Sequence, residues 1–259
     1  MALLLPDLDD DIPRNVVVTR HVFAAGTHYP LHAHVRGQFA MAGTGAISVA
    51  TPQGRWLVPP RHGCWILARL AHEMTMSGEV VMLNVFIAPD ATLLLPSGAC
   101  VLAVSPLLRE LVQQALQLPA LYDLQGRGGA LMALLPQEIA AMPSLPLHAP
   151  LPADPRLARV CRGVFLAPTL QHDLDAMAAE AMMSRRTFTR LFREQTGVSV
   201  AQWRQQACLL AALLRLADGQ PVTRVALDLG YASPSAFSAA FRRVLGQSPR
   251  DYLQAAGAP

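Results

Sequence analysis

The sequence predicts an α+β chain in which a β-barrel or β-sandwich is followed by an all-helical domain. Between Asn15 and about Phe86, apolar residues come in short runs separated by Gly, Pro and His, as is typical of short strands. From Ser105 onward, apolar residues recur at three- and four-residue steps, which is typical of helices. A chain of 259 residues has room for two domains of roughly 100–200 residues each.

The strand region contains six apolar runs, namely VVVT, QFAMA, AISVA, RWLV, CWIL and VVMLNVFI. Two predicted helices follow at 105–117 and 126–142, and they could close the barrel or pair two chains. The segment PSLPLHAPLPADP has five prolines in thirteen residues, so it cannot hold a long helix and should run extended. We therefore predict a barrel domain at 1–142, a proline-rich linker at 143–153 and a helical domain at 154–259.

Charge is distributed unevenly between the two halves. Residues 1–154 hold eight Arg and eleven acids, whereas residues 155–259 hold thirteen Arg and seven acids. The C-terminal half is therefore the candidate binder of a polyanion. The four cysteines (Cys64, Cys100, Cys161 and Cys208) include no Cys-x-x-Cys pair. This spacing disfavours a thiolate zinc site and a disulfide framework, and it indicates buried thiols in a reducing compartment.

The N-terminal segment MALLLPDLDDDIPR has no basic region before its apolar run, and acids follow where a signal peptide needs small residues. No stretch of about 18 apolar residues is free of charges, Gly and Pro. We therefore expect a cytoplasmic protein that does not interact with a membrane.

The segment DLDAMAAEAMMSRRTFTRLFREQTG predicts a short helix, a turn at Met182–Met183 and a second helix with Ser184 as its N-cap. Phe188, Leu191 and Phe192 share one face of that second helix, and the opposite face is polar. The polar face carries Arg186, Thr189, Arg190 and Arg193. Arginines on such a face can pair with guanine or hold phosphates, although a solvated face of an ordinary helix has the same composition.

The same pattern recurs in PVTRVALDLGYASPSAFSAAFRRVLGQSPRDYL, with Ser233 as the cap and Phe237 and Phe241 as the apolar stripe. Two copies of one supersecondary unit favour a function over a chance pattern. Between them, VAQWRQQACLLAALLRLADG predicts a helix of about 17 residues, roughly 26 Å long. A spacer of this length could present the two second helices to major-groove segments about 34 Å apart.

The region from about Asp154 to Leu253 resembles the DNA-binding domain of the AraC/XylS family of bacterial regulators, most specifically in ALDLGYASPSAFSAAFRRVLGQSPRDY. The resemblance implies a transcription regulator, activator or repressor, that binds promoter DNA, works with RNA polymerase and forms a homodimer. It also implies a set of DNA-contacting residues: Arg185, Arg186, Thr189, Arg190, Arg193, Ser235, Ser238, Ala239, Arg242 and Arg243. Of these, Arg242 and Arg243 are expected on phosphates.

Three departures from the family pattern matter. Ala239 stands where relatives often have a long polar side chain, so discrimination between sequences is expected to rest mainly on the first unit. Met182 occupies a turn position where the family usually has Gly, and a left-handed non-Gly residue costs about 1 kcal/mol or more. Ala207 and Cys208 replace a commonly basic stretch of the spacer helix, which could remove a salt bridge or phosphate contact.

In the N-terminal half, His32 and His34 would point to one face of a strand, with Gln38 on that face and His72 one or two strands later. Three imidazoles and an amide oxygen could bind a divalent first-row metal. The spacing from Gly26 through His32-x-His34 and Gln38 to Gly45 resembles the first cupin motif, with Gln38 in place of the usual Glu. In the second motif His72 fits, but Arg69 stands near the expected Gly.

The resemblance to a cupin sensor implies an effector pocket at His32, His34, Gln38 and His72, filled by nickel, zinc, iron or manganese, or by an organic molecule without metal. A purely structural role for these histidines is a third alternative. His28 and His62 lack the spacing and are expected at the surface or rim. We do not expect an enzyme, because only Glu73 offers a carboxylate beside the histidines. The competing hypotheses are a cupin oxygenase or isomerase with a DNA-binding tail, and an architectural protein whose cupin only dimerises.

Overall fold

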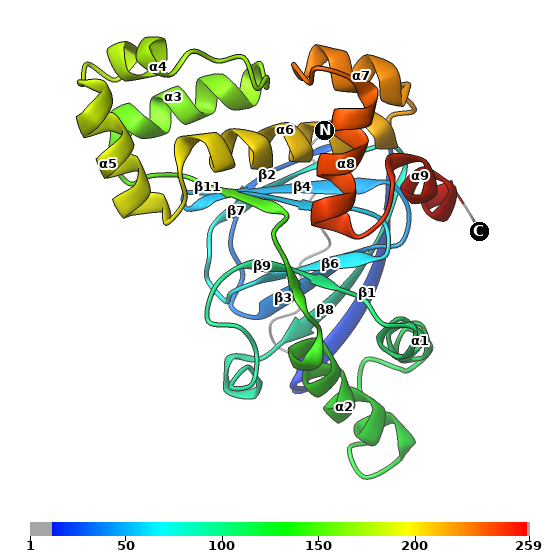
Figure 1. Ribbon diagram of the computed structural model, residues 1–259. Helices are drawn as coiled ribbons and strands as arrows, with labels where there is room; N and C mark the ends of the chain where they lie inside the picture. The colour runs from blue at the N-terminus through cyan, green and yellow to red at the C-terminus, as the bar shows by residue number, and fades with distance from the viewer. Residues whose placement is uncertain (1–11, 258–259) are drawn as a thin grey trace. The chain divides into compact units, whose positions relative to one another are not determined.

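The computed structural model describes residues 12–257, with side chains described for residues 12–253. The N-terminal apolar run, interpreted above as not being a signal peptide, lies outside the described residues. The chain forms two compact units (Figure 1). The first unit extends to Val49 and resumes from Val58 to Leu145, and the second consists of Ala50–Leu57 and the chain from Pro146 onward. Within residues 12–257, no helix has the length and apolarity needed to cross a bilayer.

The first unit contains a six-stranded sheet of order β1-β8-β3-β6-β9-β10 and the three strands β4-β7-β2. Neighbouring strands of the larger sheet are antiparallel, as are β2 and β7. The strands are β1 (Val16–Phe23), β2 (His28–His32), β3 (Gly37–Ala42), β4 (Ala46–Thr51), β6 (His62–Ile66), β7 (His72–Ser77), β8 (Val80–Ile87), β9 (Cys100–Ala103) and β10 (Ser144–Leu145). A short 3-10 helix, η1 (Pro89–Ala91), follows β8.

Side chains alternate between the two faces of the six-stranded sheet. On β3, Phe39 and Met41 join a cluster of buried apolar side chains with residues of α1 (Pro106–Ala115) and α2 (Arg127–Ala141). Gln38, one residue from Phe39, therefore lies on the opposite face, because the side-chain period of a strand is two. The two predicted helices thus cover one face of the sheet, and the candidate pocket residue lies on the other.

The second unit is helical apart from β5 (Gly54–Val58), which pairs with β11 (His148–Pro150). Its helices are α3 (Pro155–Leu166), α4 (Leu174–Glu180), α5 (Arg185–Thr196), α6 (Val200–Ala217), α7 (Val222–Asp228), α8 (Pro234–Leu245) and α9 (Pro249–Gly257). The long α6 contacts α3, α5, α7, α9 and β11. Its Trp203 is fully buried, and the indole Nε1–H donates to Pro150 O at 2.6 Å.

The proline-rich segment differs from the linker predicted at 143–153. It contains β10 and β11, and both lie at the edge of their sheets. A proline lacks the N–H that a central strand donates, so edge positions are where it can be accommodated. The boundary between the two units falls between Leu145 and Pro146, within the predicted linker.

The four cysteines are free thiols, as expected, but their burial differs from the prediction at one position. Cys64, Cys161 and Cys208 are buried, whereas Cys100 is only partly buried. Cys100 is the first residue of the short β9.

Candidate DNA interface and histidine cluster

The first recognition helix is α5, and its ends are those that the sequence predicts. The Ser184 hydroxyl accepts from Thr187 N–H at the N-cap, and Gly197 ends the helix with a left-handed φ of 75°. Phe188 and Phe192 are fully buried. The helix therefore has one face fixed in the core and one face free to meet a ligand.

The exposed face of α5 carries the predicted arginines, but not all of them are free. Arg190 is bound to Glu194 at 2.8 Å, and Arg185 to Asp175 at 3.2 Å. Arg186 and Arg193 are exposed and make no ion pair within the described residues. Thr189 is half-buried, and its hydroxyl donates back to the helix at Arg185 O.

The second recognition helix, α8, repeats this construction. Ser233 caps its N-terminus, Gly246 ends it with φ 73°, and Phe237 and Phe241 are buried. Its outer face carries smaller side chains than α5. Ser235, Ala239, Arg242 and Arg243 are exposed, and Ser238 is half-buried with its hydroxyl donating to Pro234 O.

The two turns that precede these helices are equivalent in backbone and different in sequence. Met182 has φ 56° two residues after α4, and Gly230 has φ 80° two residues after α7. The first turn therefore keeps the left-handed conformation although it lacks glycine. Met182 is 74% exposed, so its side chain contributes little packing to offset the backbone strain.

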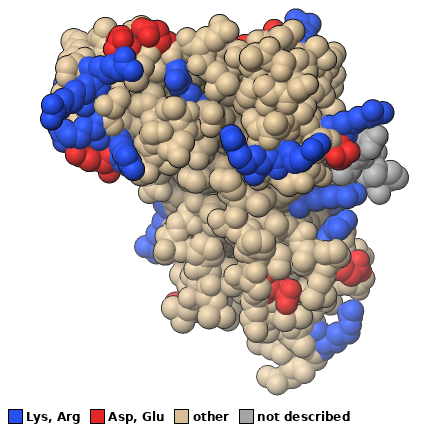
Figure 2. All heavy atoms as spheres, viewed as in Figure 1, with Lys and Arg blue, Asp and Glu red and all other residues tan. Residues whose placement is uncertain are grey.

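The spacer between the two motifs is α6, which has 18 residues. At its N-terminus, Ser199 and Gln202 form a reciprocal capping box. Figure 1 shows α5 near one end of α6 and α8 near the other. Arginine atoms gather over the end of the unit that contains α4 and α5, with acidic atoms beside them (Figure 2). The outer faces of α5 and α8 thus form a surface in two parts, and neighbouring acidic side chains partly neutralise its positive charge.

In the first unit, the structure brings together the three histidines that the sequence predicts. One ring nitrogen of each of His32, His34 and His72 lies within 4.8 Å of those of the other two. His32 and His72 are cross-strand partners on β2 and β7, and their ring centroids are 4.2 Å apart. Ring nitrogens from two strands and from the loop after β2 thus converge on one point.

Backbone carbonyls fix the tautomer of each ring. Nδ1 of His32, His34 and His72 lies 2.9, 2.6 and 2.8 Å from the carbonyl oxygens of Pro30, Arg36 and Leu70, respectively. Since a carbonyl only accepts, each Nδ1 carries the proton, and each neutral ring presents a lone pair at Nε2. Nε2 of His32 and of His72 is buried and has no hydrogen-bond partner among the described residues. This is the arrangement that metal-binding histidines require.

Gln38 completes the cluster. Its Oε1 faces His34 Nε2 at 3.0 Å, while its Nε2–H donates to Asn84 Oδ1 at 2.8 Å. Asn84 in turn donates to Thr19 Oγ1 at 3.3 Å. Two acceptors at the His34–Gln38 distance need a cation or a proton between them, and metal–ligand bonds of about 2.0–2.2 Å place adjacent donors roughly this far apart. The residues present therefore fit a divalent metal.

Burial favours the neutral form of His32 and His72. Desolvation lowers the pKa of His72 to about 4 and also lowers the pKa of His32. The charges of neighbouring histidines lower both pKa values further. At neutral pH these rings are therefore unprotonated, which is the state in which imidazole binds metal.

The two motif glycines and Arg69 shape the surrounding turns. Gly26 and Gly45 have φ of 76° and 61°, and Arg69 has φ 61°. Arg69 thus keeps the left-handed conformation of the glycine it replaces, and its N–H donates to His34 O at 2.8 Å. The departure in sequence leaves the backbone next to His34 in a glycine-like turn.

Other polar residues of this unit fall outside the cluster or were missed from the sequence. His28 is exposed, His62 is half-buried, and neither belongs to the cluster. Glu73 lies 3.9 Å from His28. Asn84 and Thr19, which fix Gln38, were not predicted. The signal was present at Asn84, since it is the single polar residue within VVMLNVFI on β8.

Comparisons with known proteins agree with the two-motif architecture. A family model described as a helix-turn-helix domain matches residues 177–255. The HTH-type transcriptional regulator NimR of Escherichia coli K12 is 33% identical over 224 residues, which is 86% of this chain and 82% of NimR. The arabinose operon regulatory protein of the same organism is 30% identical over 109 residues, which is 41% of this chain and 36% of that protein.

Among solved structures, the DNA-binding domain of AdpA in complex with a target DNA is 39% identical, with a TM-score of 0.37. The match covers 40% of this chain and 93% of that domain. The similarity to NimR extends through both units, whereas the similarity to the arabinose regulator covers less than half of the chain. The chain belongs to the AraC/XylS family of DNA-binding transcription regulators.

Proposed function

We propose that this chain is a one-component regulator whose first unit binds a divalent metal effector and whose second unit binds promoter DNA. The observation that carries the proposal is the acceptor pair His34 Nε2 and Gln38 Oε1, 3.0 Å apart, beside the unpartnered Nε2 atoms of His32 and His72. Unpaired buried acceptors are costly unless a ligand satisfies them. A metal ion would satisfy all four.

The available ligand atoms restrict which metal ions could bind at this site. Three neutral imidazoles and one amide oxygen suit nickel, zinc, iron or manganese better than calcium or magnesium, which prefer oxygen ligands. His32, His34 and His72 would hold the ion, with Gln38 as a weak fourth ligand. A bound ion would supply a fixed positive charge and cross-link β2, β7 and β3, which stiffens that end of the strands.

An organic effector is the second candidate, and the amide chain supports it. If both amides were rotated, Gln38 would donate to His34 Nε2, and Asn84 would donate to Gln38, with every group satisfied. The cluster would then be a hydrogen-bonding wall, and His32 and His72 would remain to bind a ligand with hydrogen-bond donors.

Metal content distinguishes the two candidates. Plasma mass spectrometry is applied to tag-free protein and to a His32→Ala/His34→Ala variant. We expect near-stoichiometric metal in the parent and none in the variant. Parent protein that is empty and also refuses added nickel, zinc, iron and manganese would leave the organic effector as the candidate.

Regulation requires DNA binding that is specific and salt-sensitive. Gel shifts with fragments upstream of the protein's own and neighbouring genes should show saturable binding that weakens as salt rises, because arginines displace counterions from phosphates. RNA polymerase and a second copy of the chain are the further partners that we propose at the promoter. An effector would act by binding one of two states of the regulator more tightly than the other.

Enzymatic chemistry is not part of the proposal. The nearest predicted acid–base candidate, Glu73, contacts His28, and no carboxylate joins the histidine cluster within the described residues. Such a site lacks the neighbouring acid or base that a hydrolytic or isomerising metal centre uses. Turnover of a candidate substrate that is lost in His32→Ala would contradict this.

A further inference from the structure

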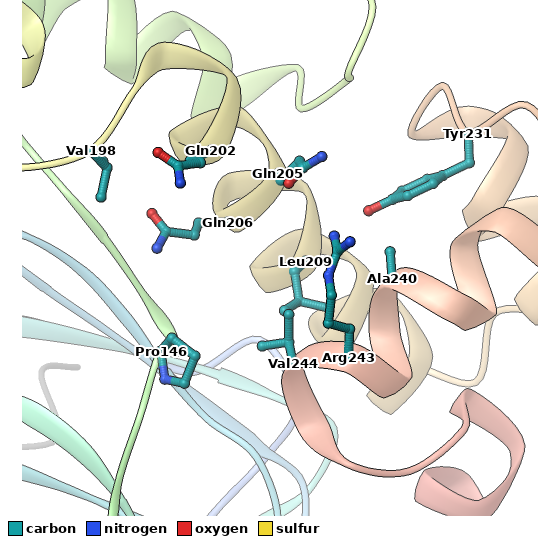
Figure 3. Close-up of a pocket in the computed structure, with 10 residues that line it drawn as sticks. All are labelled: Pro146, Val198, Gln202, Gln205, Gln206, Leu209, Tyr231, Ala240, Arg243 and Val244. Carbon is teal, nitrogen blue, oxygen red and sulfur yellow. The ribbon is translucent and has the colours of Figure 1, made fainter.

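The second unit contains a pocket that its DNA-binding role does not require. It lies between α6, α8 and the chain segment at Pro146, and all of its lining residues belong to this unit (Figure 3). Its volume is about 200 Å³, which is below the roughly 300–1,000 Å³ of pockets for drug-sized ligands. A ligand for this pocket is therefore small.

One end of the pocket is positive and rich in hydrogen-bond donors. Figure 3 shows the Arg243 guanidinium and the Tyr231 hydroxyl directed into the same space beside Gln205. Burial raises the pKa of Tyr231 to about 12, so its hydroxyl keeps its proton and can donate. No acidic residue lines the pocket within the described part of the chain. This end suits a carboxylate, which pairs with arginine and accepts from a phenol.

The other end of the pocket has an unsatisfied acceptor. Gln206 Oε1 is buried and has no hydrogen-bond partner within the described residues. In Figure 3, Gln206 lies on the Val198 side of Leu209, away from Tyr231. A buried amide oxygen without a partner is costly, so a ligand group that donates an N–H or O–H there would stabilise the complex.

Apolar side chains form the wall between these ends. They are Pro146, Val198, Leu209, Ala240 and Val244. A chain of methylene groups buried against them gains about 0.8 kcal/mol per CH₂ in the general case. The pocket thus offers, in order, a cation, an aliphatic wall and a hydrogen-bond acceptor.

We propose that this pocket binds a short aliphatic carboxylic acid with a terminal hydroxyl or amine, and that the bound acid weakens DNA binding by the second motif. Arg243 is on the recognition helix α8 and is one of the residues expected on phosphates. A carboxylate paired with Arg243 would neutralise the guanidinium, which could then no longer pair with a DNA phosphate. The loss of one phosphate contact corresponds to an affinity decrease on the order of fivefold near physiological salt.

Isothermal titration calorimetry of the full chain tests the binding, with 6-hydroxyhexanoate as the probe. We expect a Kd on the order of 1 mM. Arg243→Gln should weaken binding at least about tenfold, because a charge-assisted pair is lost. The matched control is Arg242→Gln, since Arg242 is exposed on the same helix and does not line the pocket; it should bind the probe as the parent does.

Two control ligands test which group of the probe each end of the pocket recognises. Hexane-1,6-diol lacks the carboxylate and hexanoate lacks the terminal donor, and both should bind more weakly than 6-hydroxyhexanoate. Ala240→Leu, which fills the pocket and leaves Arg243 in place, should also weaken binding. Equal binding of the diol, equal losses in Arg242→Gln and Arg243→Gln, or no binding of the probe by the parent would each overturn the proposal.

Fluorescence anisotropy with a bound DNA fragment tests the consequence. Saturating 6-hydroxyhexanoate should weaken DNA binding by the parent about fivefold and leave the already weakened Arg243→Gln variant unchanged. If the probe binds but DNA affinity stays the same, the regulatory half of the proposal is wrong. If probe binding is lost in His32→Ala/His34→Ala and kept in Arg243→Gln, the barrel is the site, and the assignment to this pocket is wrong.

Discussion

The proton position on each imidazole is set by the backbone next to it. His32 and His72 each donate Nδ1–H to a carbonyl two residues earlier, and His34 donates to one two residues later. No charged residue is needed to orient the rings, so the cluster stays in a neutral environment. The same burial that removes water from His32 and His72 also makes their protonation costly.

Stability should therefore depend on pH through His72. Its pKa is about 4 in the folded chain, against 6.5 for an ordinary histidine. Between these values the unfolded chain binds a proton that the folded chain does not, so the free energy of unfolding rises with pH across this window. The full contribution is present above pH 6.5, and the loss below about pH 4 amounts to about 3 kcal/mol.

Urea unfolding of metal-free protein, followed by tryptophan fluorescence between those pH values, measures this slope. His72→Gln should reduce this slope, because one titrating ring is gone while His32, whose pKa burial also lowers, remains. His28→Gln is the matched control, since His28 is exposed and outside the cluster. Parallel slopes for the parent and for His72→Gln would show that another group is responsible.

The left-handed Met182 gives a second prediction at this scale. Met182→Gly should raise the free energy of unfolding of the second unit by about 0.5–1 kcal/mol, since relief of strain exceeds the added backbone entropy of glycine. Differential scanning calorimetry measures the change. The reciprocal Gly230→Met should destabilise, because a Cβ there would lie 2.7 Å from Thr169 Oγ1 at φ 80°. A lower melting temperature for Met182→Gly would mean that its exposed side chain makes a stabilising contact.

At the scale of elements, the two recognition helices have the same ends and different outer faces. Both begin at a serine cap and end at a left-handed glycine. The α5 face presents long arginines, two of which are paired with acids, whereas α8 presents Ser235 and Ala239. The first helix is therefore expected to read bases and the second to hold the backbone.

Two substitutions separate these roles. Arg186→Ala should weaken binding to a selected site by about 1–3 kcal/mol and relax base preference at one position. Arg242→Ala should weaken binding about equally for all sequences and reduce the slope of log K against log salt by about 1. Anisotropy titrations on a site selected from randomised DNA, repeated on mismatched sites at several salt concentrations, measure both. If Arg186→Ala weakened DNA binding equally on all sequences, Arg186 would not be a residue that distinguishes bases.

Elements with a strong periodic pattern were predictable from sequence, and pairings between distant strands were not. Capping serines, buried phenylalanines and the long spacer helix follow from local spacing, so Ser184, Ser233 and α6 agree with the structure. The short β9 and the strands within the proline-rich segment depend on partners far away in the chain. The histidine spacing is local and predicted the cluster, whereas the link from Asn84 to Thr19 became visible only through the pairing of β1 with β8.

At the scale of the whole molecule, α1 and α2 offer a surface for a second copy of the chain. Their inner faces are committed to the core, since Leu108 and Leu135 are fully buried. Leu107, Leu121 and Leu124, on or between these helices, are 52%, 62% and 58% exposed. Exposed leucines are candidates for an interface, and the expected homodimer would give them a partner.

Leu107→Glu/Leu121→Glu should therefore convert the expected homodimer into a monomer. Point substitutions test this better than deletion of 105–142, because deletion would also remove buried core side chains. Sedimentation equilibrium measures the mass, and Leu166→Glu is the control, since Leu166 is 88% exposed at the end of α3 in the second unit. An unchanged mass for the double variant would exclude this surface as the interface.

Metal and DNA should also affect each other's binding. If the metal favours the state that binds DNA more tightly or more weakly, thermodynamic linkage requires that DNA change metal affinity by the same factor. Couplings between sites are typically about 5–150-fold. We expect DNA affinity measured with chelator and with metal to differ within this range, and metal affinity measured with and without DNA to differ by an equal factor. In His32→Ala/His34→Ala both differences should vanish, while binding of DNA by the metal-free chain persists. Metal that binds to the parent with no change in DNA affinity would make the cluster a structural site, and regulation would then have to come from another ligand.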